Sequence, residues 1–408
     1  MLWKVSVVAI VTIVFLYELF LTLLSLRSKN NPIPPCVNDV YDPESYQKHL
    51  SYRAEKSRLE LLRSSAGYLI DVVLLLTNAY AAFSGLFFRG TWVQLLAVVL
   101  LSAVSSLLLL PFEYCDTMGI EQKYGFNRTD KKTFVLDRIK EFVLQFVLML
   151  GLASLIMGLH LAFGDWLILV FAAIATLFLL FITFLFPFFS RIFNTFRPLE
   201  DGELKDRLTH LLEKNGYRVR AIQVMDASRR STKANAYFAG FGKMKTIVLY
   251  DTLLDTMTAD EICAVFAHEL GHGLHKDTLK NQLLSFLQML ILGALAWLTL
   301  RTPELFTAFG FSEVNYGFAL LLIMSVEFAL IQPLFGLLAN AFSRRAEYRA
   351  DAHAASEGYG EALISGLKKL SRQNFANLSP SPLLVALTYS HPTLAQRIEA
   401  IRKTEQNA

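Results

Sequence analysis

Residues Ala264–Asp277 read AVFAHELGHGLHKD. On a helix, residues four positions apart project from one face, so His268 and His272 can offer two imidazoles to the same metal ion. Glu269 lies beside the first histidine, which gives the H-E-x-x-H arrangement in which a glutamate acts as general base next to zinc. The alternative is an amphipathic helix whose histidines bind backbone or carboxylate groups, but two buried histidines without a partner would be costly. The stretch therefore predicts a helix that carries a catalytic zinc site.

A catalytic zinc takes three protein ligands and keeps one position open, so a third ligand must come from elsewhere in the chain. The segment SRRAEYRADAHAASEG at 343–358 has a helical pattern and places Glu347 and Asp351 four residues apart. One of these carboxylates can bind the metal while the other holds a histidine ring. Three histidines are rival third ligands: His275, His353 and His391. We expect His353 on another face of its helix, at the surface.

The segment YSHPTLAQRIEAIR at 389–402 places His391 before a proline that we expect to begin a helix, with Arg397 six residues later. A histidine and an arginine near a metal can stabilise the oxyanion that forms during hydrolysis. A helix cap and a surface salt bridge would explain the same two residues without catalysis.

The composition is that of an integral membrane protein. Hydrophobic residues make up 54% of the 408 residues, 32 are phenylalanine, and the mean hydropathy is +0.40. The net charge of +4 is spread over several segments, which argues against a nucleic-acid partner and leaves membrane lipid as the surroundings. Seven apolar stretches are long enough to cross a bilayer: Leu2–Leu26, Gly67–Phe88, Trp92–Pro111, Phe142–Phe163, Trp166–Phe189, Leu283–Leu300 and Tyr316–Phe342.

Lysine and arginine alternate between the two sides of these seven stretches. The connections after the first, third and fifth stretches and the C-terminal tail hold 7, 6, 14 and 9 of them, against 1, 0 and 1 in the other connections. Basic loops favour the cytoplasmic side, so the N-terminus is expected outside and the C-terminus in the cytoplasm. We predict a membrane domain at 1–190, with cytoplasmic loops at 27–66 and 112–141, and a catalytic domain at 191–408 that helices at 283–300 and 316–342 interrupt.

The catalytic domain has an α+β pattern. The segment 201–217 reads as an amphipathic helix that ends at a glycine, and AIQVMDA and KTIVLY, at 221–227 and 245–250, read as strands. The glycines between these strands suggest a turn. Thr258 and Glu261 have the spacing of a capping box at the start of the helix that carries His268.

Together these motifs resemble the zinc-dependent, multi-pass CAAX prenyl protease family, which are integral-membrane gluzincins. The resemblance rests on GIEQKYGFNRTDKKTFVLDRIKE at 119–141, NAYFAGFGKMKTIVLYDTLL at 235–254, HELGH at 268–272, SRRAEYRAD at 343–351 and YSHPTLAQRI at 389–398. It implies one Zn²⁺ per chain, bound by His268, His272 and Glu347, with Glu269 activating the water and Asp351 behind the ligands. It further implies that Asn235 binds substrate on an edge strand and that His391 and Arg397 contact the scissile region.

The fold class expected is mostly α: a seven-transmembrane-helix bundle with a cytoplasmic α+β zincin domain, and the resemblance implies that the bundle encloses a chamber. The expected function is a zinc metalloendopeptidase acting near the C-terminus of CAAX-type, prenylated peptide or protein substrates. A quality-control protease that ignores prenylation is the alternative, and a seven-helix transporter is a remote one. The short chain and its end, IRKTEQNA, favour a bacterial cytoplasmic membrane over the endoplasmic reticulum.

Overall fold

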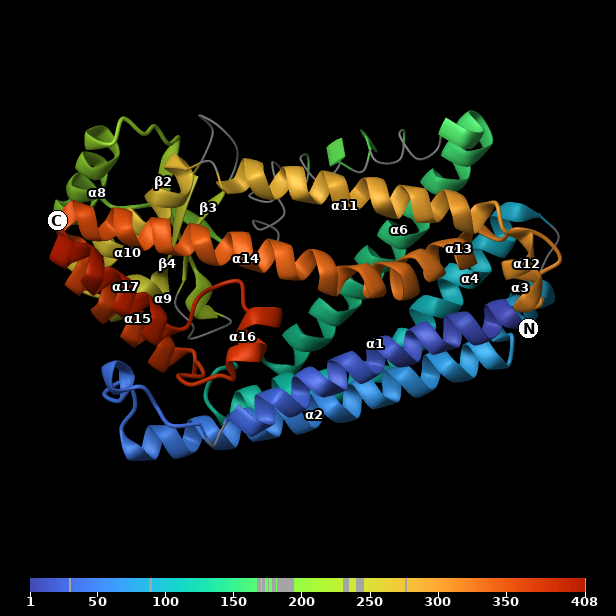
Figure 1. The fold of residues 1–408 in the computed structure, drawn as a ribbon, viewed down its shortest axis with the longest axis horizontal. Helices are drawn as coiled ribbons and strands as arrows, with labels where there is room; N and C mark the ends of the chain where they lie inside the picture. Colours follow the sequence, from blue (N-terminus) through green and yellow to red (C-terminus); the bar gives the residue numbers. More distant parts are fainter. Residues whose placement is uncertain are drawn as a thin grey trace.

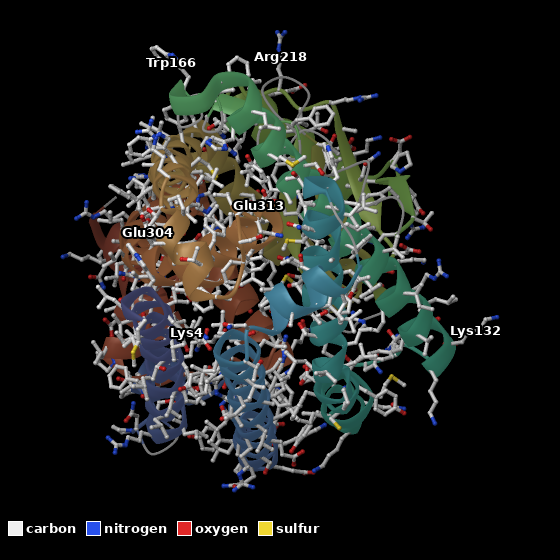
Figure 2. The ribbon with its side chains drawn as sticks, turned by 90° about the vertical axis from the view of Figure 1, so that its right-hand side faces the viewer. Lys4, Lys132, Trp166, Arg218, Glu304 and Glu313 are labelled. Atoms are coloured by element: carbon white, nitrogen blue, oxygen red, sulfur yellow. The ribbon has the colours of Figure 1, made fainter. Side chains whose placement is uncertain are left out.

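Long helices and one small sheet form the protein (Figure 1). The computed structural model describes residues 1–28, 31–87, 90–166, 170, 173–174, 176–177, 181, 194–229, 235–239, 246–275 and 277–407. In Figure 1 the sheet and its helices lie at one end, and the N-terminus lies at the other. Figure 2 views the molecule from the N-terminal end, where Lys4, Glu304 and Glu313 are labelled.

The first part of the chain is helical. Its α-helices are α1 (Leu2–Arg27), α2 (Pro43–Leu76), α3 (Ala79–Phe87), α4 (Thr91–Ser106), α5 (Leu110–Tyr114) and α6 (Lys131–Phe163). Short 3-10 segments are η2 (Pro35–Val37), η3 (Leu107–Leu109) and η5 (Gly164–Trp166), and η4 (Cys115–Glu121) is a π-helix. Helices α1 and α2 run side by side along one edge of the molecule (Figure 1).

Five helical segments of the described residues are long and apolar enough to cross a membrane: Leu2–Arg27, Thr91–Glu121, Lys131–Phe163, Leu279–Leu300 and Tyr316–Gln373. Helices α2 and α3 would make a sixth if counted together, but they are bent by 62°. Asn78, between them, adopts a left-handed φ of 56°, a conformation that ends helices. The stretch predicted at Gly67–Phe88 is therefore broken rather than straight. The stretch predicted at Trp166–Phe189 lies largely outside the described residues, so the count of seven stays a prediction.

The second part of the chain begins with the sheet. Its elements up to the metal-motif helix are β1 (Phe196–Pro198), α8 (Glu203–Lys214), β2 (Ala221–Met225), η6 (Ala227–Arg229), β3 (Ala236–Ala239), β4 (Thr246–Tyr250), α9 (Asp251–Thr256) and α10 (Ala259–Leu274). The described strands have the order β1-β2-β4-β3. Strands β2 and β4 are parallel, with Ala221 opposite Thr246, whereas β3 runs antiparallel to β4 with Ala236 opposite Leu249.

Both strands that the sequence predicted are present, as β2 and β4. The segment between them, for which the glycines suggested only a turn, contains β3, as the resemblance implied for the NAYF segment. Strand β1 was missed because it has only three residues and includes Pro198. The predicted capping box is confirmed, since the Thr258 side chain accepts from the Glu261 backbone and the Glu261 side chain accepts from the Thr258 backbone.

The remaining elements are α11 (Asp277–Leu300), α12 (Pro303–Ala308), α13 (Tyr316–Leu322), the π-helices η8 (Ile323–Glu327) and η9 (Ala355–Tyr359), α14 (Phe328–Ala354), α15 (Gly360–Gln373), α16 (Pro382–Thr388) and α17 (Leu394–Asn407). In Figure 1 helix α11 runs on the side of the molecule opposite α2, and α14 lies between α11 and α1 and leads back to the sheet. Helix α17 begins two residues after Pro392, so that proline precedes the helix and does not start it.

Helices α10 and α14 pack closely, and Gly271 makes this possible. A Cβ at Gly271 would lie 2.9 Å from the Ala350 Cα and 3.2 Å from the His353 Cβ. Because α14 continues without interruption from the last apolar stretch to Ala354, this contact joins the membrane helix directly to the helix that carries H-E-x-x-H.

Candidate metal centre

Two imidazoles from α10 face one carboxylate from α14. The Nε2 atom of His272 lies 3.2 Å from Glu347 Oε1, and the Nε2 atom of His268 lies 3.5 Å from Glu347 Oε2. One ligand atom from each of the three residues lies within 4.8 Å of the other two. The geometry thus brings together the three residues that the resemblance assigned to zinc.

The spacing of these atoms fits a tetrahedral ion. Two ligands held at ~2.0–2.1 Å from one ion at a tetrahedral angle are roughly 3.3 Å apart. The two nitrogen–oxygen distances lie on either side of that value. Glu347 Oε2 is also buried without a hydrogen-bond partner among the described residues, which suits an atom that a cation would satisfy.

Each histidine has a second carboxylate behind it. Asp351 Oδ1 lies 2.9 Å from His268 Nδ1, and Asp277 Oδ2 lies 3.3 Å from His272 Nδ1. Such contacts fix the tautomer in which Nδ1 carries the proton and leave Nε2 free for a metal. Asp351 was expected from the sequence. Asp277 was missed, although it stands at the end of the HGLHKD segment, because it reaches His272 only across the break between α10 and α11.

The surrounding carboxylates make the centre attractive to positive charge. Burial opposes protonation of His268, but its hydrogen bond with Asp351 and the nearby negative charge of Glu347 raise its pKa to about 9. The pKa of His272 is also raised, since its contact with Glu347 outweighs burial. A metal cation would occupy the place of these protons.

Glu269 lies next to the cluster and is partly exposed. It lines a cavity of about 540 Å³ together with His272, Glu347 and Tyr237 of β3. Burial raises the pKa of Glu269, while the neighbouring histidines oppose the shift. A carboxylate whose pKa is moved towards neutral is suited to accept a proton and return it.

His391 and Arg397 both reach Glu347. The Nε2 atom of His391 lies 3.3 Å from Glu347 Oε1, and Arg397 Nη1 lies 3.4 Å from Glu347 Oε2. The side chain of His391 is 61% exposed, so it remains accessible to substrate. Arg397 is buried and donates two hydrogen bonds to Asp351, of 2.8 and 2.6 Å. The guanidinium therefore braces Asp351 and Glu347, which favours a positioning role over direct contact with the oxyanion.

Three other residues singled out from the sequence, Asn235, His275 and His353, lie outside the three-ligand cluster. Asn235 immediately precedes β3 and is exposed, and its carbonyl accepts from the Tyr250 backbone N–H at 3.1 Å. His275 is turned back onto the Gly271 carbonyl at 2.8 Å, away from the three-ligand cluster. His353 was expected at the surface but is half-buried, because it packs against Gly271 where α10 and α14 meet.

Comparisons with known proteins agree with this centre. Residues 22–195 match the family model described as "CAAX prenyl protease N-terminal, five membrane helices", and residues 198–405 match that of peptidase family M48. The chain belongs to peptidase family M48. It is thus a metallo-endopeptidase of the membrane, and the transporter alternative is set aside.

Relatives align over nearly the whole length of this M48 peptidase. The "Probable CAAX prenyl protease 1" of Schizosaccharomyces pombe is 30% identical, over 98% of this chain and 89% of its own. The human "CAAX prenyl protease 1 homolog" is 28% identical, over 97% of this chain and 94% of its own. The crystal structure of S. mikatae Ste24p superimposes with a TM-score of 0.90 at 28% identity, covering 98% and 99% of the two chains. These relatives are eukaryotic, and a bacterial origin for this chain stays a prediction.

Proposed function

We propose that this M48 peptidase is a zinc endopeptidase that hydrolyses peptide bonds near the C-terminus of prenylated, CAAX-type substrates. The cluster of His268, His272 and Glu347 carries the proposal, since two imidazoles and one carboxylate are the ligand set of a catalytic zinc. The names of the aligned relatives support the substrate class.

The reaction needs a base, which Glu269 supplies. Zinc, when bound, would lower the pKa of water towards 7 and polarise the scissile carbonyl. Glu269 takes the proton from the attacking water and later delivers it to the leaving amine. Its partial exposure in the 540 Å³ cavity leaves room for both partners.

Substrate is bound as an additional strand along β3. Of the described strands β3 is at one edge of the sheet, and Tyr237 places it in the cavity of Glu269. Main-chain pairing tolerates varied side chains, and Asn235 at the start of the strand offers a side-chain amide for it. His391 stabilises the developing negative charge, while Arg397 holds Asp351 and Glu347 in place.

We propose the membrane arrangement that the sequence predicts. The domains are 1–190 and 191–408, seven helices span the bilayer around a chamber, and the catalytic domain faces the cytoplasm. The basic connections support this orientation, and the M48 relatives support an integral membrane protein.

The test compares a farnesylated CAAX peptide with an unprenylated copy. Purified protein should cleave the farnesylated peptide faster. Glu269→Gln should retain one zinc per chain and lose cleavage by ~10²–10⁴-fold, whereas Glu203→Gln, at an exposed site on α8, should change neither. Cleavage by Glu269→Gln at the wild-type rate would contradict the role of Glu269. Equal cleavage of the two peptides would favour the quality-control alternative.

A further inference from the structure

A second cavity adjoins the metal centre from a different direction. Its volume is about 1050 Å³, and it shares no lining residue with the cavity of Glu269. His391 and Arg397 line it at the metal centre. Residues of α1, α2, α5, η4, α6 and the C-terminal helices α15, α16 and α17 line the rest, together with the connection between α15 and α16. Because both of these side chains contact Glu347, a chain passing the metal from β3 can continue into this space.

The cavity is charged, and most of its charges are already paired. Five basic side chains other than histidine line it: Arg53, Lys56, Arg63, Arg138 and Arg397. Four of them contact carboxylates, in the pairs Lys56–Asp116, Arg63–Glu113, Arg138–Glu113 and Arg397–Asp351. Among the described residues Arg53 has no carboxylate within ion-pair distance. Its recorded hydrogen bond goes to the neutral Ser25 hydroxyl of α1, at 2.7 Å.

Arg53 lines the cavity from α2, and only one of its nitrogens donates to a described residue. It is half-buried on α2, and the bond to Ser25 fixes one arm of the guanidinium. Its charge reaches Tyr389, two residues before His391: burial raises the pKa of Tyr389, and Arg53 opposes that shift. A guanidinium has five N–H donors in a planar fork that matches a carboxylate or a phosphate. A half-buried, unpaired fork of this kind is suited to an anionic ligand.

We infer that Arg53 binds the terminal carboxylate of the peptide substrate, in the cavity on the leaving-group side of the metal centre. This inference rests on the proposed function. Cleavage near a C-terminus releases a short fragment, and its terminal carboxylate is the one negative charge present whatever the fragment's sequence. Cavities of roughly 300–1,000 Å³ hold ligands of this size, so the fragment fits the space observed. A lipid phosphate is the other source of a matching anion.

The experiment uses two farnesylated CAAX peptides that differ only at the end, one a free acid and one a C-terminal amide. A charge-assisted hydrogen bond gives wild-type protein a preference for the acid of ~10–100-fold in kcat/KM, mainly through KM. Arg53→Gln should lose this preference and keep the wild-type rate on the amide. Arg53→Lys should restore part of it. Arg58→Gln, on the exposed side of the same helix, should behave as wild type.

The outcomes separate the inference from the proposed function. If wild-type protein cleaves acid and amide equally well, the inference fails and the proposed function stands. If it cleaves neither, both fail. An equal loss on both peptides in Arg53→Gln would show a structural role only. The same assay is repeated with phosphatidylglycerol vesicles. If the vesicles stimulate wild-type protein but not Arg53→Gln, and the acid preference of that variant persists, the cavity binds a lipid headgroup and the inference is overturned.

Discussion

Replacing Asp277 by asparagine should weaken zinc binding by about tenfold. The contact with His272 Nδ1 is 3.3 Å, longer than the 2.9 Å between Asp351 and His268. Loss of a carboxylate behind a ligating histidine typically costs 10–100-fold in metal affinity, and the longer contact places Asp277→Asn at the lower limit. Tenfold corresponds to about 1.4 kcal/mol. The oxygen of the asparagine amide can still accept a hydrogen bond from Nδ1–H. The histidine therefore keeps its tautomer but loses the negative charge behind it.

The measurement is a zinc titration of purified protein against a competing chelator. Asp277 also pairs with Arg349 and Lys280, whose side chains are 40% and 58% exposed, so water replaces those contacts at little cost. Lys280→Gln removes one of these surface pairs alone and should leave zinc affinity unchanged. An Asp277→Asn protein that binds zinc as tightly as wild type would refute the role given to this carboxylate. Equal weakening in Lys280→Gln would assign the effect to the surface pair.

Two further predictions concern stability. Gly271→Ala should destabilise the protein by about 1–3 kcal/mol, because the added methyl group meets Ala350 at 2.9 Å, whereas Gly151→Ala, which has open space around it, should not; thermal unfolding of both variants checks this. Burial favours a raised pKa for Glu261, but hydrogen bonds from Lys369 and Ser365 outweigh it and lower the pKa below 4.5. Its stabilising effect is therefore complete above pH 4.5 and is lost as pH falls through the lowered pKa. Glu261→Gln should flatten this acid-side loss in unfolding measured from pH 6 to 3, and an unchanged slope would contradict the assignment.

The cluster of His268, His272 and Glu347 could be predicted because helix periodicity translates spacing into direction. His268 and His272 share a face of α10, and Glu347 and Asp351 share a face of α14, as their separation of four residues requires. The sequence left the third ligand open between a carboxylate and three histidines. Packing favours the carboxylate: the close contact at Gly271 brings the Glu347 face onto the histidines and holds His353 beside the glycine.

Features that depend on contacts between distant elements were beyond the sequence. Asp277 reaches His272 across a helix break, and Arg53 of α2 meets the cavity of His391 only after the first and last parts of the chain pack together. Neither contact has a periodic signal. Strand β3 was expected only from the family resemblance and not from the local sequence pattern. Its four residues follow a long polar stretch, and local turn signals outweighed its propensity.

The continuity of α14 connects membrane anchoring with catalysis. Helix α14, of 27 residues, contains both the end of the last apolar stretch and Glu347. His268 and His272 belong to α10, whose buried residues pack against the sheet. His268, His272 and Glu347 therefore stay together only while α10 and α14 keep their relative positions. Gly271 permits their approach, and the ion pair of Arg397 with Asp351 joins α17 to α14. Glu347 lies about 29 Å along the helix from Phe328, so a small tilt at the membrane end would move Glu347 by several ångströms. The position of the helix in the bilayer is thus part of the geometry of the metal centre.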